Sequence, residues 1–468
     1  MKKTNKPVLL GGTPVRRKTF SSRPMVDERE VEAVAQSMRE GLFSRFVGSN
    51  LPGTRESLGK TSAELRELAG SHTFFGGPNV RRFEAEWAEK HGVPYAIAVN
   101  SATSGLTAAL MAMDIGPGDE VVTTPLSFTA TATAIVAANA IPVFADIDPE
   151  TLCLSAETVA RVLTPKTRCL LPVHWCGNAG DFDAVLRLAG ERGLRVLEDA
   201  AQAPGTYYQG RALGGWGNAG VFSFSEPKNV TTGEGGMIIT SDPAIAAKCR
   251  LIRNHGEAIP NSEDSDADVM NAVGFNFRMV EATAAMGWVQ TSKLGEANRI
   301  RHGNFQYFMD RMHGVADGCL LPQRLTHPES FACYTAAFRW KEEESGLSRN
   351  LIARALRAEG IPLATGVGRL MSNHPMFQRR LAFGRGHCPF SCHLHEGRVE
   401  YDAAKLPAAQ QVHDREYLAF FLMGWPNTEA DMDDIVAAFE KIIDWREELM
   451  EFEKTNPNSE LAFDRGRV

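Results

Sequence analysis

A lysine between two apolar segments is the residue whose chemistry stands out in this sequence. Lys228 follows an apolar, aromatic run at 221–224, and a glycine-rich turn at 233–236 leads from it into a β-branched run at 237–240. Glycine permits tight backbone turns, so Lys228 is expected to be held between two strands. Partial loss of water favours the neutral amine of a lysine, the form that attacks a carbonyl carbon. Lys228 is therefore a candidate for covalent catalysis, with a surface lysine at a hairpin tip as the alternative.

Two polar features upstream of Lys228 favour the catalytic interpretation. Residues 100–105 (NSATSG) follow an expected strand and open an expected helix, where free backbone N–H groups and the helix dipole attract an anion. Asp199 ends a buried run at 195–199, where a carboxylate without a partner is costly. Its side chain either caps the next helix or pairs with a protonated heterocyclic nitrogen.

Taken together in chain order, these residues match the needs of pyridoxal 5′-phosphate (PLP). That cofactor requires an anion site for its phosphate, an acid that keeps its pyridine nitrogen protonated, and a lysine that carries its aldehyde. Phe128 follows the segment TTPLS at the end of an expected strand, where its ring could stack on the cofactor or pack in the core.

The elements that must position these residues alternate between strand and helix. Such alternation is typical of parallel βαβ units, and ligands of such sheets bind beyond the carboxyl ends of the strands. Strands are expected at 96–99, 120–123, 142–145, 169–173 and 195–197 and on both sides of Lys228, with helices at 101–113, 129–138 and 181–192. The pattern predicts an α/β fold with a mostly parallel central sheet covered by helices on both faces.

Four units are expected along the chain. An N-terminal segment (1–74) holds a helix at 27–40 and a Gly/Ser-rich insertion at 42–72 that we interpret as a flexible, lid-like loop. The large α/β domain covers 75–295, beginning with a helix at 83–91. A smaller α+β domain follows at 296–452, with helices at 351–359 and 429–449, and a polar tail covers 453–468.

Composition excludes several other classes of protein. The 468 residues are 43% hydrophobic and 23% charged with a net charge of −7, which gives no electrostatic case for nucleic acid or an anionic membrane. No apolar run follows Met1, and no stretch of about 18 apolar residues could span a bilayer. Eight dispersed cysteines are best interpreted as reduced thiols, so we expect a cytoplasmic protein.

Several short segments, in this order, resemble the DegT/DnrJ/StrS-type sugar aminotransferases, a branch of the fold-type-I PLP enzymes. They are LGG at 10–12, NSAT at 100–103, FTATATA at 128–134, PVFADID at 142–148, EDAAQ at 198–202, FSF at 222–224 before Lys228, GEGG at 233–236 and GFNFR at 274–278. The resemblance implies a Schiff base on Lys228, Asp199 at the pyridine nitrogen, Gln202 at the ring hydroxyl and Phe128 stacked on the ring. It also implies a phosphate site formed by Ala102, Thr103 and Ser223.

Asn276, within GFNFR, resembles the residue that such enzymes lend to the phosphate in the neighbouring subunit. The resemblance therefore implies a homodimer with shared active sites, whereas the alternative is an amide that satisfies a local loop. Relatives that remove C–O bonds carry histidine where this chain has Lys228, which favours transamination over dehydration. One departure is Ala102, which stands where a glycine is usual.

A segment rich in cysteine and histidine at 387–395 invites a zinc interpretation, but a second ligand pair at suitable spacing is missing. Its candidate ligands are His387, Cys388, Cys392, His393 and His395. A similar CPFxC segment occurs in the branch that acts on keto-cyclitols of the scyllo-inosose type. Together with His374, this resemblance favours a keto-cyclitol substrate. His174 follows an expected strand and is either a substrate contact or a structural hydrogen-bond partner.

The leading functional hypothesis is transfer of an amino group from glutamine or glutamate to a cyclic polyol ketone, in amino-sugar, aminocyclitol or antibiotic biosynthesis. Alternatives are a nucleotide-ketosugar aminotransferase and a dehydratase or 3-amino-5-hydroxybenzoate-type synthase built on the same site. A PLP-binding regulatory protein without turnover is a further alternative, although no DNA-binding motif or basic patch supports it.

Overall fold

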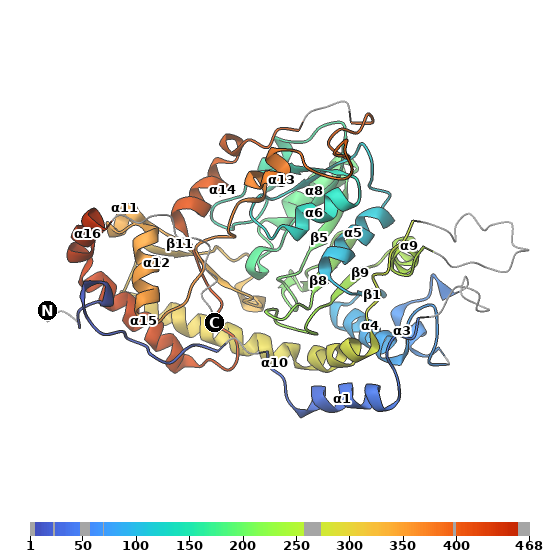
Figure 1. Ribbon diagram of the computed structural model, residues 1–468, viewed down its shortest axis with the longest axis horizontal. Coiled ribbons are helices and arrows are strands. Elements are labelled where there is room, and N and C mark those ends of the chain that lie inside the picture. Colours follow the sequence, from blue (N-terminus) through green and yellow to red (C-terminus); the bar gives the residue numbers. More distant parts are fainter. Residues whose placement is uncertain are drawn as a thin grey trace, which may run out of the picture.

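The computed structural model describes residues 5–21, 24–46, 57–68, 70–256, 273–395 and 399–456. Its two main parts are a large α/β unit around a seven-stranded sheet and a smaller unit around a three-stranded sheet (Figure 1). Within the insertion expected at 42–72, residues 47–56 and 69 lie outside the described residues, as do 257–272 and 457–468. The described part of the insertion includes the short helix α3 (Ser62–Arg66) and the buried Leu58 and Leu65, whereas the lid-like role remains a prediction. No helix among the described residues is long and apolar enough to cross a membrane.

The large sheet has the strand order β1-β9-β8-β5-β4-β2-β3. Its strands are β1 (Tyr95–Val99), β2 (Glu120–Thr123), β3 (Ile141–Phe144), β4 (Thr167–Leu171), β5 (Arg195–Asp199), β8 (Ala219–Ser223) and β9 (Gly236–Thr240). Strands β3, β2, β4, β5 and β8 run parallel, whereas β9 is antiparallel to both β8 and β1. The expected mostly parallel central sheet is confirmed.

Helices cover both faces of this sheet because alternate side chains of each strand point in opposite directions. Ile97 and Val221 pack with the apolar sides of α5 (Ala102–Ala112), α6 (Ala130–Ala137) and α9 (Pro243–Arg253). On the other face, Ala98 and Phe222 pack with α4 (Pro78–His91). Helices α7 (Ala156–Ala160) and α8 (Phe182–Arg192) cover the remaining strands on that face.

The smaller unit is an antiparallel sheet with its own apolar core. Strands β10 (Leu320–Pro322), β11 (Ala336–Trp340) and β12 (Tyr417–Phe420) pack with α12 (Arg349–Ala358) and α15 (Glu429–Asp444). Its shorter elements are α11 (Glu342–Ser345) and the π-helix η7 (Val412–Glu416), whereas α13 (Pro375–Gln378) and α14 (Pro407–Gln411) pack in the core of the large unit. In the large unit, β6 (Tyr207–Tyr208) and β7 (Arg211–Ala212) form a separate hairpin.

A single long helix, α10 (Glu281–Met312), connects the two units, and the sequence did not predict it. Its buried residues contact α4 early in the helix and α15 late in it, so no single apolar stripe marks it. In Figure 1, α10 runs beneath both units, with α1 (Glu28–Arg39) outside it. The expected domain boundary at 295/296 falls inside this continuous helix. The domain limits therefore remain predictions.

The prediction of a single helix at 429–449 is wrong. It is divided at Trp445, whose φ of −112° and ψ of 24° are not helical, into α15 and α16 (Arg446–Thr455). The apolar spacing that suggested one helix continues across the break, because Ile442 and Leu449 are both buried in the core of the smaller unit. Periodicity alone could not reveal the change in direction.

The outer edge of β1 is closed by side chains. Ser62, the first residue of α3 (Ser62–Arg66), bonds both the N–H and the C=O of Ala96 through its hydroxyl. Glu84 accepts from the N–H of Ala98, and Arg253 donates to the C=O of the same residue. Glu84 and Arg253 are themselves paired and fully buried. The polar backbone groups along this edge are thus satisfied without a further strand.

The opposite edge strand, β3, is covered by the segment that contains the two nearby cysteines. Phe390 packs against Phe377 and Tyr401, and Tyr401 donates from its hydroxyl to the C=O of Pro142 in β3. The pairing of Phe383 with Cys388 folds this segment back on itself. This Cys/His-rich segment therefore forms a cover for the sheet edge.

Candidate active site

Three strands of the parallel part of the sheet, β8, β5 and β2, bring the candidate residues to one end of it. Asp199 is the last residue of β5 and Ser223 the last of β8, and these strands are parallel neighbours. Phe128 follows the carboxyl end of β2 in the turn that opens α6. These side chains therefore lie at the edge of the sheet where parallel strands bind ligands, as the sequence predicted.

Asp199 has two hydrogen-bond partners and is only 5% exposed. The Thr131 hydroxyl donates to its Oδ2 at 2.7 Å, and the N–H of Ala201 donates to its Oδ1 at 3.2 Å. Burial raises the pKa of the Asp199 carboxyl, while these hydrogen bonds and the charge of Lys228 oppose that rise. The carboxyl group is thus held in place and is electrostatically coupled to the lysine.

The N-terminus of α5 lies directly against the end of β8 and the start of β9. Ser223 pairs in register with Gly236, and a Cβ added at Gly236 would lie 2.6 Å from the backbone nitrogen of Ala102. Ser101 caps the helix by accepting from the N–H of Ser104. Glycine at 236 therefore lets the N-terminus of α5 approach the backbone at the start of β9 closely, which brings Ala102 beside the strand end that carries Ser223.

Lys228 lies on an aromatic ring contributed by the smaller unit. Its Nζ is 4.1 Å from the centroid of the Tyr334 ring, within cation–π distance. The Tyr334 ring meets Phe421 edge-on at 5.8 Å. Sequence patterns could not reveal this contact, because Tyr334 lies between β10 and β11 and no motif marks it. The amine of Lys228 is thus held between the two units, as expected for a lysine that does not extend freely into solvent.

Gln202 is fixed through one end of its carboxamide. Its Oε1 accepts from the N–H of Cys176 at 2.8 Å, so its NH2 group is the end that can donate to a ligand oxygen. Cys176 has a positive φ of 59°, and its thiol lies 3.6 Å from the Tyr417 hydroxyl. Burial raises the pKa of the Cys176 thiol to about 12, so this cysteine is a neutral part of the wall.

Two of these observations test whether the residues suit PLP. Phe128 is 60% exposed, an unusual state for a phenylalanine in a well-packed unit and a suitable one for stacking on a ring. The N-terminus of α5, with the amides of Ala102 and Thr103 in its first turn, lies beside the end of β8 that carries Ser223, as a phosphate site requires. With the buried carboxyl of Asp199 and the amine of Lys228 nearby, the residues present fit the cofactor.

His174 lies beside Asp199 through its backbone, since its N–H donates to the C=O of Asp199, but its ring has other partners. Its ring is fully buried, its Nε2 is 2.8 Å from Glu198 Oε2, and it meets the Phe182 ring edge-on. Glu198 and Asp199 are adjacent in β5, so their side chains point to opposite faces of the sheet. The contacts of His174 are those of the structural alternative and give no support to a substrate role.

His374 lies closer to the ligand-binding end of the sheet. It precedes α13, and the N–H of nearby Met371 donates to the C=O of Pro125, in the turn that leads to Phe128. Its side chain is partly exposed. The backbone contact places this segment at the rim of the crevice, where a substrate role for His374 remains a prediction.

The histidine at the end of the Cys/His-rich segment has a partner other than a metal. His395 Nε2 is 2.8 Å from Glu120 Oε1, and Glu120 begins β2 at the end opposite to Phe128. Within the described ranges, no group of three or more potential ligands is arranged to hold a metal ion. This contact places the end of the segment at the amino end of β2, away from the strand ends that carry Asp199 and Ser223.

Asn276 lies at the rim of the phosphate site of its own chain. Its C=O accepts from the Asn100 side chain at 3.4 Å, while its own side chain is exposed. The Asn100 N–H donates to the C=O of Phe277, which fixes this segment beside the turn that precedes α5. The exposed side chain is available to another molecule, but its role in a partner subunit remains a prediction.

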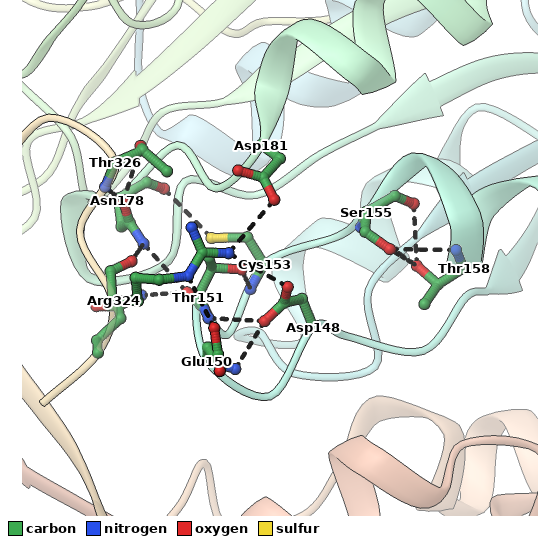
Figure 2. Close-up of polar contacts among 11 residues, drawn as sticks. Asp148, Glu150, Thr151, Cys153, Ser155, Thr158, Asn178, Asp181, Arg324 and Thr326 are labelled. Carbon is green, nitrogen blue, oxygen red and sulfur yellow. Dashed lines mark hydrogen bonds and ion pairs between the residues drawn. The ribbon is translucent and has the colours of Figure 1, made fainter. Parts of the chain in front are cut away.

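A polar cluster fastens the smaller unit to the large sheet (Figure 2). Arg324, just after β10, pairs with Glu150 at 2.9 Å, Asp181 at 3.3 Å and Asp148 at 3.5 Å. The buried Asn178 donates to the C=O of Arg324 at 3.0 Å. The ion pairs are partly exposed and individually weak, but the set fixes the smaller unit, and with it Tyr334, relative to Lys228.

The fold and these residues define a fold-type-I enzyme whose cofactor is PLP. A model of the DegT/DnrJ/EryC1/StrS aminotransferase family matches residues 57–414. The chain belongs to this family and is an aminotransferase.

The chain is similar to a curated relative and to solved structures over most of its length. It is 34% identical to the spore coat polysaccharide biosynthesis protein SpsC of Bacillus subtilis (strain 168) over 405 residues, which cover 84% of this chain and 97% of SpsC. An aminotransferase structure from Psychrobacter cryohalolentis is 29% identical with a TM-score of 0.72, covering 90% of this chain and 98% of that one. The structure of DesI in the presence of its TDP-sugar product is 25% identical with a TM-score of 0.72, covering 96% and 99%.

Proposed function

We propose that this aminotransferase moves an amino group from glutamine or glutamate to the ketone of a cyclic polyol. The observation that carries the proposal is the position of Lys228, whose amine lies on the Tyr334 ring and is coupled to the buried carboxyl of Asp199. An amine at the junction of two units, beside an anion site and an exposed aromatic ring, suits transfer between two small molecules that bind in turn.

Each residue then has a definite task. When bound, PLP supplies an electron sink. Asp199 would keep the pyridine nitrogen protonated, and this proton is what allows the ring to accept electrons. Phe128 stacks on the ring, Gln202 donates to its hydroxyl, and the amides of Ala102 and Thr103 with Ser223 hold the phosphate. Lys228 Nζ takes the proton from the α-carbon of the donor and delivers a proton to the carbon that receives nitrogen in the acceptor.

For the acceptor we favour a keto-cyclitol. The support is the resemblance of the CPFSC segment at 388–392, together with His374 at the rim of the crevice. Because that segment covers the edge of β3, the resemblance marks a branch of the family and supplies no substrate contact. A nucleotide-linked ketosugar is the second candidate, favoured by the similarity to DesI, whose structure was determined in the presence of a TDP-sugar product.

The site should be completed in a homodimer, in which the exposed Asn276 side chain reaches the phosphate of the neighbouring subunit. A two-fold pair exchanges such a contact reciprocally. Lys228 disfavours the dehydratase alternative, and a regulatory protein without turnover would show no reaction with any donor.

One experiment distinguishes these functions. Purified holoenzyme is incubated with glutamine or glutamate and, separately, with scyllo-inosose-type keto-cyclitols and nucleotide ketosugars, and the aminated product is identified by mass spectrometry. We expect amination of a keto-cyclitol. Amination of the nucleotide sugars alone would transfer the assignment to the second candidate, and loss of a hydroxyl without gain of nitrogen would establish a dehydratase.

A further inference from the structure

Arg301, in the second half of α10, is a cation near the crevice that the tasks above leave without a role. Among the described residues, no hydrogen bond or ion pair satisfies its guanidinium. Burial lowers the pKa of this guanidinium, so the group is partly removed from water. A charged group that has lost water without gaining partners is costly, which points to an anion that completes the site.

The position of Arg301 connects it to Lys228. Asn298, one turn earlier on α10, accepts from Asn229, the residue after Lys228, at 3.0 Å. The charge of Arg301 acts on Tyr334, the residue on whose ring the Lys228 amine lies. Arg301 therefore lies in the region where α10, the segment around Tyr334 and the residue after Lys228 come together.

Gly424, just before α15, sets the position of this guanidinium. A Cβ added at Gly424 would lie 2.7 Å from Cζ of Arg301, so only glycine lets the planar group rest there. A planar fork of donors held by such a close approach suits a carboxylate, which it can bind through two parallel hydrogen bonds.

We propose that Arg301 binds a carboxylate of the amino-acid donor. This inference rests on glutamine or glutamate as the donor. The amino carbon of the donor must come to Lys228, and its carboxylates are one to three bonds from that carbon. In a nucleotide sugar the diphosphate is farther from the reacting ketone, so a cation in the region that adjoins the Lys228 segment fits the donor better than the acceptor.

The test compares Arg301→Gln and Gly424→Ala with Arg299→Gln, which removes the same charge from an exposed position on the same helix. Steady-state kinetics give KM for the donor and for the ketone separately. A second measurement uses glutarate, a dicarboxylate without an amino group, and follows its effect on Tm of each holoenzyme. Circular dichroism checks that the variants fold.

In Arg301→Gln we expect KM for the donor to rise about 10- to 100-fold, with little change in KM for the ketone. Stabilisation by glutarate should be lost in the same variant and kept in Arg299→Gln. Gly424→Ala, which retains the charge but displaces it, should show a smaller defect in the same direction.

Unchanged donor KM together with unchanged stabilisation by glutarate in Arg301→Gln would overturn the proposal. A rise confined to KM for the ketone would also overturn it and would assign Arg301 to an anionic group of the acceptor. If neither glutamine nor glutamate reacts with the wild-type enzyme, the donor assignment fails, while loss of glutarate stabilisation would still establish the carboxylate site.

Discussion

The contacts of Asp199 allow its charge to be separated from its shape. Asp199→Asn keeps the size of the side chain and an oxygen for the N–H of Ala201, but it removes the charge that maintains the ring proton. We expect the cofactor still to bind and turnover to fall on the order of 100-fold or more. Absorbance spectra of the holoenzyme and steady-state rates measure the two effects.

The matched control for this change is Thr131→Val, which removes the hydroxyl that donates to Asp199 and retains the carboxylate. Its effect on turnover should be much smaller. Near-normal turnover in Asp199→Asn would mean that the carboxylate serves only to hold the local backbone.

Lys228 should be the residue that carries the cofactor. Borohydride reduction of the yellow holoenzyme should leave a stable adduct that peptide mass spectrometry maps to Lys228, and Lys228→Ala should lose both adduct and turnover. Lys248→Ala is the control, because that lysine pairs with Asp114 at the surface. An adduct that maps to Lys248 or Lys166 would contradict the assignment.

A buried histidine at the end of α4 makes the stability of the protein depend on pH. His91, its last residue, is fully packed between the Trp87 and Phe222 rings, and burial lowers its pKa from an ordinary value of 6.5 to about 4. The unfolded chain therefore takes up a proton below pH 6.5, whereas the folded chain resists protonation until about pH 4. The contribution of neutral His91 to the free energy of unfolding is fully present above pH 6.5 and is lost as the pH falls from 6.5 to about 4.

The size of that loss follows from the shift of about 2.5 pKa units, roughly 3 kcal/mol of unfolding free energy between pH 6.5 and 4. In His91→Gln, urea titrations across this window should show a shallower dependence of the unfolding free energy on pH. His313→Gln, at an exposed position, is the control for removal of one histidine. An unchanged slope in His91→Gln would show that another group controls acid stability.

The elements differ in how far their sequences predicted them. Strands of the large sheet were placed within about two residues, because short β-branched runs alternate with helices in a regular order. The positions of Asp199 and Phe128 at strand ends followed for the same reason, whereas Ser223 was named only by the resemblance, and the roles of all three remain predictions. Tyr334 and Arg301 were missed because they reach the site only through α10 and the long-range pairing of β10, β11 and β12, which no local pattern records.

At the scale of the whole molecule, mixing variant subunits tests whether two chains share their active sites. Consider a dimer formed from one Asn276→Ala chain and one Lys228→Ala chain. If Asn276 acts in the site of the partner subunit, this dimer has one intact site and one site that lacks both residues. Random exchange makes half of the dimers mixed, so activity should recover to about a quarter of the wild-type value. The double variant mixed with wild-type protein is the control for exchange.

If exchange is verified by mass spectrometry and activity does not recover, Asn276 acts within its own chain or away from the cofactor. In either case the exposed side chain would need another explanation, and the proposal of shared sites would be withdrawn.

Both edges of the large sheet are covered, β1 by Ser62, Glu84 and Arg253, and β3 by Tyr401 with the Cys/His-rich segment packed against it. Backbone groups that are already satisfied cannot template the addition of a strand from another molecule. Addition of a strand from a second copy at the β1 edge is therefore disfavoured, which protects this edge against the growth of a fibril. Glu84→Ala, by freeing the N–H of Ala98 and leaving Arg253 unpaired, would remove that protection at β1 and should favour aggregation on heating.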